Sequence, residues 1–276
     1  MTDHDASRTT ASWAGAPDLD ASRPQSARIY DYLLGGKDNF APDRAVGDAL
    51  IQEVPALPAM VRGQRAFLAR AVRYLVTECG VRQFLDIGTG IPAADNVHEV
   101  AQTLAPDARV VYVDNDPIVL SHARALMTGT SEGATAFILA DIRDPAALLQ
   151  HSELIATLDH ERPIALMLLG IVHHLRDADD PYGLVATLVD WLPPGSYLTI
   201  AGPASDFDPE AMAAVAASAE RSGVPYVARS REETLRFFTG LDLVEPGIVP
   251  IQEWRPDEPG APEVYGWAVM GRTPPR

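Results

Sequence analysis

The sequence predicts an α/β protein with a doubly wound, mostly parallel sheet covered on both faces by helices. Between residues 83 and 201, five short apolar runs alternate with amphipathic helical segments. The runs are continuously apolar, which is typical of parallel strands that are buried on both faces. Four Asp-Pro pairs stand where the intervening helices are expected to begin, and this pair suits the N-cap and the first helical position. Repeated strand–helix units of this kind indicate a Rossmann-like sheet.

Each predicted element has its own signal. The apolar runs predict strands at residues 83–87, 109–113, 134–140, 164–169 and 197–201. The Asp-Pro pairs predict helices that begin after Asp116, Asp144, Asp180 and Asp208. Ser230 and Glu233 have the spacing of a capping box, which predicts a further helix through Phe238. Residues 241–244 and 264–270 predict two C-terminal strands, and we expect this pair to form an antiparallel edge of the sheet.

The first 80 residues predict two further segments. Residues 1–22 are rich in Ser, Thr, Ala and Asp and have little apolar periodicity, which is typical of a disordered tail. Residues 23–80 have a helical pattern that is interrupted by prolines and by Gly35-Gly36, and we expect them to form a helical cap. Residues 81–276 would then form the main domain.

Composition limits the class of function. The chain has 276 residues, with 22 Lys and Arg against 38 Asp and Glu, a net charge of −16 and a single cysteine. So acidic a chain is a poor binder of nucleic-acid phosphates, and no apolar run reaches the roughly 20 residues of a membrane span. The sequence shows no secretory signal and no Cys/His zinc pattern. We therefore expect a cytoplasmic protein that acts on a small molecule and binds no metal, membrane or nucleic acid; the sequence leaves its oligomeric state open.

Four residues mark the carboxyl ends of the first four predicted strands. They are Asp86, Asp114, Asp141 and Gly170, and their spacings of 28, 27 and 29 residues each match one strand-plus-helix unit. In an open α/β sheet, ligands bind beyond the carboxyl ends of the strands. The sequence therefore predicts three carboxylates and a glycine along one rim of a ligand site.

A glycine turn, Gly88-Thr89-Gly90, follows the first predicted strand. Glycines at this point allow a tight turn and a close approach of the backbone to a ligand. Together with Ala93 the turn also fits the fingerprint of a dinucleotide-binding site, so NAD(P) is an alternative cofactor. Asp86 favours a cation instead, because a pyrophosphate at about 4 Å from its carboxylate would cost about 4 kcal/mol. S-adenosylmethionine offers an ammonium and a sulfonium to the same carboxylate.

Roles for the other rim residues follow from this cofactor. Asp114 can accept hydrogen bonds from both hydroxyls of a ribose, a role common to both cofactors. Asn115 would border the adenine. Asp141 can accept from the adenine amino group while the backbone N–H of Ile142 meets a ring nitrogen. The alternative is that these aspartates only cap helices or form turns.

Longer motifs resemble a known family. The segments LDIGTG, VVYVDNDP and ADIRDP are similar to the nucleotide-binding motifs of class I S-adenosylmethionine-dependent methyltransferases. The segments ARIYDYLLGGKDNFAPDR, DIGTGIPAADNVHEVAQ, VVYVDNDPIVLSHARAL and DPYGLVATLVDWLPPGSYL resemble an actinobacterial family of S-adenosyl methyltransferases, formerly a domain of unknown function. The resemblance spans about residues 24–270 and implies a seven-stranded sheet with a reversed last strand, a helical cap and S-adenosylmethionine as cofactor. Pro92 departs from the general class I pattern, where a third glycine often stands.

The segment 28–44 predicts a lid over the cofactor. It combines aromatic, cationic and amide side chains around Gly35-Gly36, and we expect Tyr30 or Asn39 to lie near the methionine end of the cofactor. A closed lid excludes water and orders the reactants. The alternative is a helical hairpin that packs on the sheet.

His173 and His174 follow the fourth predicted strand, where the transferable methyl group would point. A histidine there can act as a general base for an O or N acceptor, and we assign this role to His173. The alternative is that one histidine packs in the core while the other caps the loop. Methyl transfer needs no base if alignment of the reactants supplies the acceleration.

Three functions are consistent with these residues. The first is a methyltransferase that transfers a methyl group from S-adenosylmethionine to a small molecule. The second is a protein that binds S-adenosylmethionine or S-adenosylhomocysteine without turnover, as a sensor or regulator. The third is an NAD(P)-dependent oxidoreductase.

Overall fold

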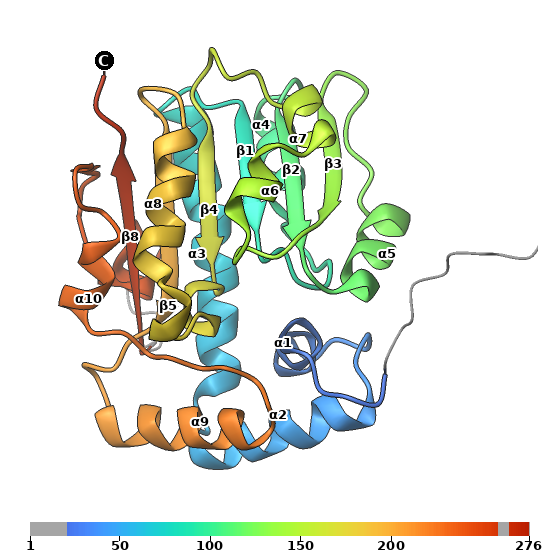
Figure 1. The fold of residues 1–276 in the computed structure, drawn as a ribbon, viewed down its shortest axis with the longest axis vertical. Coiled ribbons are helices and arrows are strands. Elements are labelled where there is room, and N and C mark those ends of the chain that lie inside the picture. Colours follow the sequence, from blue (N-terminus) through green and yellow to red (C-terminus); the bar gives the residue numbers. More distant parts are fainter. Residues whose placement is uncertain (1–20, 259–264, 276) are drawn as a thin grey trace, which may run out of the picture.

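The computed structural model describes residues 21–258 and 265–275 (Figure 1). All but the last two residues of the predicted tail therefore lie outside the described residues. Among the described residues, no helix combines the length and apolar character needed to cross a membrane.

The described residues form one mixed sheet. Its strands are β1 (Gln83–Ile87), β2 (Arg109–Asp114), β3 (Ala134–Leu139), β4 (Ala165–Leu169), β5 (Tyr197–Pro203), β6 (Asp242–Leu243), β7 (Val249–Pro250) and β8 (Gly266–Arg272). The order is β3-β2-β1-β4-β5-β8-β6, and β7 also pairs with β8. The first five strands are parallel, whereas β8 runs antiparallel to β5 and to β6. This confirms the predicted fold class and the antiparallel C-terminal pair.

The sheet has one strand more than the seven expected. The addition is β7, which has two residues and pairs antiparallel with β8 at Ala268 and Trp267. A two-residue strand that includes a proline leaves no periodic signal in the sequence, so the pattern could not predict it.

The strands are continuously apolar because both faces of the sheet are buried, as predicted. In β2, Val110 and Tyr112 belong to the core on one face of the sheet, whereas Val111 and Val113 belong to the core on the other face. Successive side chains of a strand point to opposite faces, so a strand covered on both sides must be apolar throughout. In Figure 1, α3 and α4 lie behind the sheet, and α6, α7 and α8 lie in front of it.

The helices begin where the capping residues predict. Asp116, Asp144, Asp180 and Asp208 each accept a hydrogen bond from a backbone N–H in the first turn of the following helix. These helices are α5 (Pro117–Leu126), α6 (Pro145–Leu149), α8 (Pro181–Trp191) and α9 (Pro209–Arg221). Two further helices connect strands of the sheet: α4 (Val97–Leu104) between β1 and β2, and α7 (Ser152–Thr157) between β3 and β4. The capping box of Ser230 opens α10 (Arg231–Arg236), which ends two residues before the predicted Phe238.

Three helices precede the sheet: α1 (Ser26–Leu34), α2 (Ala41–Glu53) and α3 (Leu57–Thr77). Helices α1, α2 and α9 lie beyond the carboxyl ends of the strands (Figure 1). Helix α3 instead runs along the sheet, and its Phe67 and Leu75 share a core with Phe84 of β1 and Met167 of β4. The predicted domain boundary between the helical cap and the main domain, after residue 80, stays a prediction. Of the three N-terminal helices, α3 is part of the main core, and only α1 and α2 have the position of a cap.

Candidate functional site

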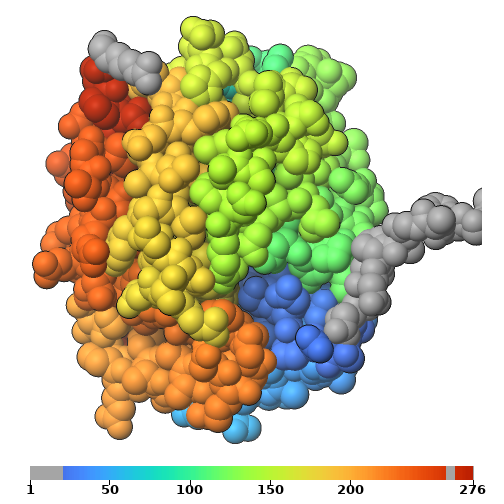
Figure 2. Space-filling view, in the orientation of Figure 1, coloured from blue at the N-terminus to red at the C-terminus, as the bar shows by residue number. Residues whose placement is uncertain are grey.

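A cavity of about 510 Å³ lies between the carboxyl ends of the strands and the helices α1, α2, α3 and α9. Figure 2 shows the α1–α2 segment in blue and the α9 segment in orange, side by side at this end of the molecule. Parallel pairing aligns Ile87 of β1 with Val113 of β2, and Val113 with Ile138 of β3. The strand ends therefore form one rim, and that rim is one wall of the cavity.

The cavity brings together all but one of the residues that the sequence predicts for the site. The residues on its wall are Tyr30, Asp86, Gly88, Thr89, Gly90, Asp114, Asn115, Asp141, Ile142, Gly170 and His173. The exception is Asn39, which is absent from the wall. Its side-chain N–H groups donate to Asp31 Oδ2 (2.8 Å) and to the carbonyl of Gly36 (3.1 Å). Asn39 thus lies off the cavity wall because its amide closes the turn after α1, and its place beside the cofactor stays a prediction.

The glycine turn is built around Asp114. Gly88 and Gly90 adopt positive φ angles of 78° and 69°, a conformation that favours glycine. The backbone N–H of Gly90 donates to Asp114 Oδ2 (2.9 Å), and that of Asp116 donates to Oδ1 (2.9 Å). Burial raises the pKa of Asp114 to about 6 although these hydrogen bonds lower it. A carboxylate has about four lone-pair positions, so Asp114 can still accept hydrogen bonds from a ligand.

Replacing Gly88 by alanine is expected to destabilise the protein by about 2–5 kcal/mol, because positive φ strains an L-residue and the added atom crowds its neighbour. A Cβ at position 88 would lie 2.8 Å from the side chain of Ile171. Gly80→Ala is the matched control, since Gly80 also has positive φ but its Cβ would meet open space. Thermal unfolding measures both variants, and equal losses would contradict the close approach of Ile171.

Asp86 is buried at the start of the glycine turn. Burial raises its pKa to about 7; the positive charge of Arg65 opposes this, and the charge of Asp114 adds to it. A carboxylate in such a place gains from a cation beside it, because the cation restores its charge. Asp86 is therefore suited to pair with an ammonium group, and this role stays a prediction.

Arg65, on α3, is a site residue that the sequence analysis missed. Its Nη2 donates to the carbonyl of Ala94 (2.6 Å), whereas its Nε is buried without a hydrogen-bond partner in the described part of the chain. Arg65 lies on the cavity wall with Asp86. An unpaired guanidinium N–H beside a buried carboxylate suits a zwitterion, with the ammonium on Asp86 and a carboxylate on Arg65. No motif signals Arg65, because it stands within an ordinary amphipathic helix.

The far end of the rim holds Asp141. Its Oδ1 accepts from the backbone N–H of Arg143 (2.9 Å), and its Oδ2 accepts from Asn115 Nδ2 (3.1 Å). Partial burial acts to raise the pKa of Asp141, but these hydrogen bonds and the charge of Arg143 outweigh it and lower the pKa. Asp141 therefore stays ionised and accepts hydrogen bonds, as a partner of an amino group must.

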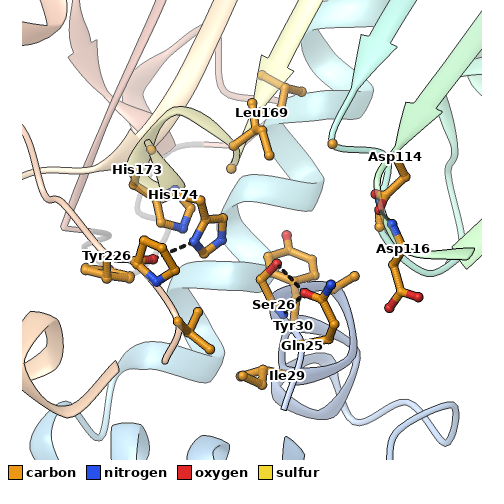
Figure 3. A pocket seen from close by; sticks show the side chains of 18 of the residues that line it. Gln25, Ser26, Ile29, Tyr30, Asp114, Asp116, Leu169, His173, His174 and Tyr226 are labelled. Atoms are coloured by element: carbon orange, nitrogen blue, oxygen red, sulfur yellow. Dashed lines mark hydrogen bonds between the residues drawn. The ribbon is translucent and has the colours of Figure 1, made fainter. Parts of the chain in front are cut away.

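Helix α1 closes the cavity over the rim. Gln25 and Ser26 at its start lie on the wall beside Tyr30 (Figure 3), and the sequence analysis predicted neither. The Tyr30 hydroxyl donates to the carbonyl of Val61 (3.1 Å), so it ties α1 to α3. Arg28 is buried and forms ion pairs with Asp43 of α2 (3.0 Å) and with Asp116 after β2 (3.3 Å). The cap is thus anchored to the loop that follows Asp114.

The two histidines lie on a 3₁₀ turn, Val172–His174, directly after β4. Nδ1 of His174 lies 2.7 Å from the carbonyl oxygen of Pro225, whereas the buried Nδ1 of His173 has no hydrogen-bond partner among the described residues. The His173 ring packs against Tyr226, with ring centroids 5.0 Å apart. Burial lowers the pKa of both rings, and the positive charge of Arg229 lowers that of His173 further.

Comparison with known proteins identifies the family of this chain. The family model described as S-adenosyl methyltransferase matches residues 12–274. A DUF574 family protein from Streptomyces avermitilis is 45% identical, with a TM-score of 0.89 over 93% of this chain and 100% of that chain. A candidate methyltransferase from Thermobifida fusca is 43% identical, with a TM-score of 0.86 over 95% of this chain and 100% of that chain. Comparison with curated proteins finds no match.

A more distant structure shares the fold. Human N-acetylserotonin methyltransferase in complex with S-adenosylmethionine is 14% identical, with a TM-score of 0.51 over 92% of this chain and 65% of that chain. The family match over nearly the whole chain decides between the cofactors that the glycine turn left open, in favour of S-adenosylmethionine over NAD(P). This chain belongs to the S-adenosyl methyltransferase family, and it is an S-adenosylmethionine-dependent methyltransferase of the class I fold.

Proposed function

We propose that the enzyme methylates a small molecule, and that the rim of the cavity binds the cofactor in an extended form. Asp86 and Arg65 would hold the amino-acid end, Asp114 the ribose, and Asp141 with the backbone N–H of Ile142 the adenine. Gly88, Thr89, Gly90 and Gly170 would let the backbone approach the cofactor, and Asn115 would border the adenine. When bound, the cofactor supplies a methyl group on a positively charged sulfur.

One observation carries this proposal: a buried carboxylate and an unpaired guanidinium N–H share the wall next to the glycine turn. Together they suit both charges of an amino acid. A pyrophosphate beside the glycine turn would meet Asp86 as a like charge. The prediction of a cytoplasmic location, made from the sequence, stays a prediction.

The acceptor is proposed to be small because it must share this cavity. Helices α1, α2 and α9 cover the strand ends, and the cavity volume of about 510 Å³ is in the range that holds a drug-sized molecule. The side chains of α1 on the wall would separate the reacting groups from water.

The proposed function is tested by calorimetric titration with S-adenosylmethionine, S-adenosylhomocysteine, NAD⁺ and NADP⁺. We expect the two sulfur nucleosides to bind and the two dinucleotides not to bind. A thermal shift supports the result, since a ligand at 100 times its dissociation constant stabilises a protein by about 2.7 kcal/mol. Binding of a dinucleotide alone would overturn the proposed arrangement.

Binding of S-adenosylhomocysteine is expected to weaken as the pH falls from 8 to 6. Its ammonium group favours ionised Asp86, whose pKa is about 7 in the unliganded protein, so below that pH binding must first remove a proton. The expected loss approaches tenfold per pH unit below the pKa. Calorimetry across this range measures it, and Asp86→Asn is expected to bind more weakly but with a flatter pH profile. The same slope in the variant would show that another group titrates.

A further inference from the structure

The wall of the cavity has a second, apolar part. Helix α2, helix α9 and the segment that follows α9 contribute Val46, Leu50, Ala219, Gly223, Val224, Pro225 and Tyr226. None of these side chains is charged. The Asp and Arg residues on the wall lie elsewhere: after or at the strand ends, in α1 and the residues just before it, and at Arg65 of α3. A charged group placed among the apolar residues would lose its hydration without gaining a partner. This part of the cavity therefore suits a neutral, apolar molecule.

His174 stands where the two parts of the cavity meet. Its Nδ1 is hydrogen bonded to the carbonyl of Pro225, which belongs to the apolar wall. A carbonyl oxygen can only accept, so Nδ1 must carry the proton and Nε2 must hold the lone pair. In Figure 3 the His174 ring points into the space between the strand ends and α1. No described residue forms a hydrogen bond with Nε2, so this atom is placed to receive a proton from a bound molecule.

The surroundings keep His174 neutral when the site is empty. Burial lowers its pKa, the hydrogen bond to Pro225 raises it, and the charge of Arg143 lowers it. Arg143 donates to the backbone carbonyl of His174 (2.9 Å), and Arg229 donates to those of Val172 (2.7 Å) and Leu175 (2.9 Å). The other titratable groups around the turn are the His173 ring and Tyr226, together with Asp141 and Asp179, which pair with Arg143, and Asp177, which pairs with Arg229. A neutral imidazole can act as a base.

His173 lacks these features. Its Nδ1 is buried without a partner among the described residues, so nothing fixes its tautomer, and its ring packs edge-on against Tyr226. The structure thus favours the second histidine of the pair over the one to which the sequence analysis gave the role of base.

We propose that the apolar part of the cavity binds a neutral aromatic or aliphatic molecule with a hydroxyl group, and that Nε2 of His174 is the base that takes the hydroxyl proton; this rests on the proposed function. The acceptor oxygen forms a bond to the methyl carbon as the carbon–sulfur bond breaks, and the sulfur keeps that electron pair and becomes a neutral thioether. The proton of the hydroxyl passes to Nε2, and the imidazolium, next to Arg143, then releases it to water.

Three probes with one apolar body and different head groups test the acceptor class: 2-naphthol, 2-naphthoate and 2-naphthylmethylammonium. Each is titrated into the protein saturated with S-adenosylhomocysteine. We expect 2-naphthol to bind at least tenfold more tightly than either charged probe. Tighter binding of a charged probe, or no binding of 2-naphthol to a protein that binds S-adenosylhomocysteine, would overturn the inference. Failure to bind S-adenosylhomocysteine would instead overturn the proposed function.

The role of His174 is tested by methylation of 2-naphthol. The variant His174→Ala is expected to lose at least about 100-fold in kcat, the usual effect of a general base, while its affinity for S-adenosylhomocysteine changes less than twofold. His174→Gln is expected to keep the KM for 2-naphthol better than it keeps kcat. His122→Ala, a change on α5 outside the cavity wall, is the matched control. No methylation of bound 2-naphthol, a His174→Ala variant that retains its rate, or a larger loss in His173→Ala than in His174→Ala would each contradict the assignment.

Discussion

Replacing Asp114 by alanine is expected to weaken the binding of S-adenosylmethionine by about 1.5–3 kcal/mol, roughly 10- to 150-fold. The proposed arrangement gives this carboxylate both hydroxyls of the ribose, and hydrogen bonds to a charged acceptor are the stronger kind. The side chain is held in place before binding, because the backbone N–H groups of Gly90 and Asp116 each donate to one of its oxygens. Calorimetric titration at pH 7.5, above the pKa of about 6, measures the loss with Asp114 ionised.

A conservative variant and a surface control sharpen this test. Asp114→Asn keeps one carbonyl oxygen and is expected to lose less affinity than Asp114→Ala. Asp190→Ala removes an exposed carboxylate from α8 and is expected to leave the affinity unchanged. If Asp114→Ala binds the cofactor as tightly as the unaltered protein while remaining folded, the ribose does not lie on Asp114.

Replacing Arg28 by alanine is expected to lower the free energy of unfolding by about 3–5 kcal/mol. Arg28 is buried, and its guanidinium pairs with Asp43 and with Asp116, both of which are also buried. Its removal leaves two carboxylates away from water without their cation, which is far more costly than the loss of an exposed pair. A loss of this size corresponds to a fall in Tm of about 6–20 °C.

An exposed ion pair is the matched control for this variant. Arg73 pairs with Asp257 at 2.6 Å, and both side chains are about half exposed. Arg73→Ala is therefore expected to change the free energy of unfolding by less than about 1 kcal/mol. Arg28→Lys keeps the charge without the planar fork and is expected to fall between the two. Equal effects of Arg28→Ala and Arg73→Ala would contradict the anchoring of α1.

The sheet could be predicted because its signals are local. A strand covered on both faces must be apolar throughout, so the run at 83–87 coincides with β1 and the run at 109–113 differs from β2 by one residue. Helix starts were equally direct, since an Asp side chain caps the next helix by bonding within three residues. The rim followed from these elements, because parallel strands of similar length end together.

The residues that the sequence analysis missed are placed by long-range packing. Arg65 reaches the site because α3 lies along the sheet, and nothing in its helical neighbourhood distinguishes it from other arginines. Asn39 shows the opposite case. Its sequence context predicted a contact with the cofactor, but its side-chain amide donates a hydrogen bond to the carboxylate of Asp31 instead. The choice between His173 and His174 depends on Pro225, which is more than 50 residues away in the chain. Spacing along the sequence carries no information on such contacts.

A crystal structure of the protein with S-adenosylhomocysteine tests the central claim most directly. The account predicts the ribose hydroxyls on Asp114, the adenine amino group on Asp141, the ammonium on Asp86 and the carboxylate on Arg65, with the sulfur facing His174. A nucleoside bound in the reverse direction, or outside the cavity between the strand ends and α1, would contradict it.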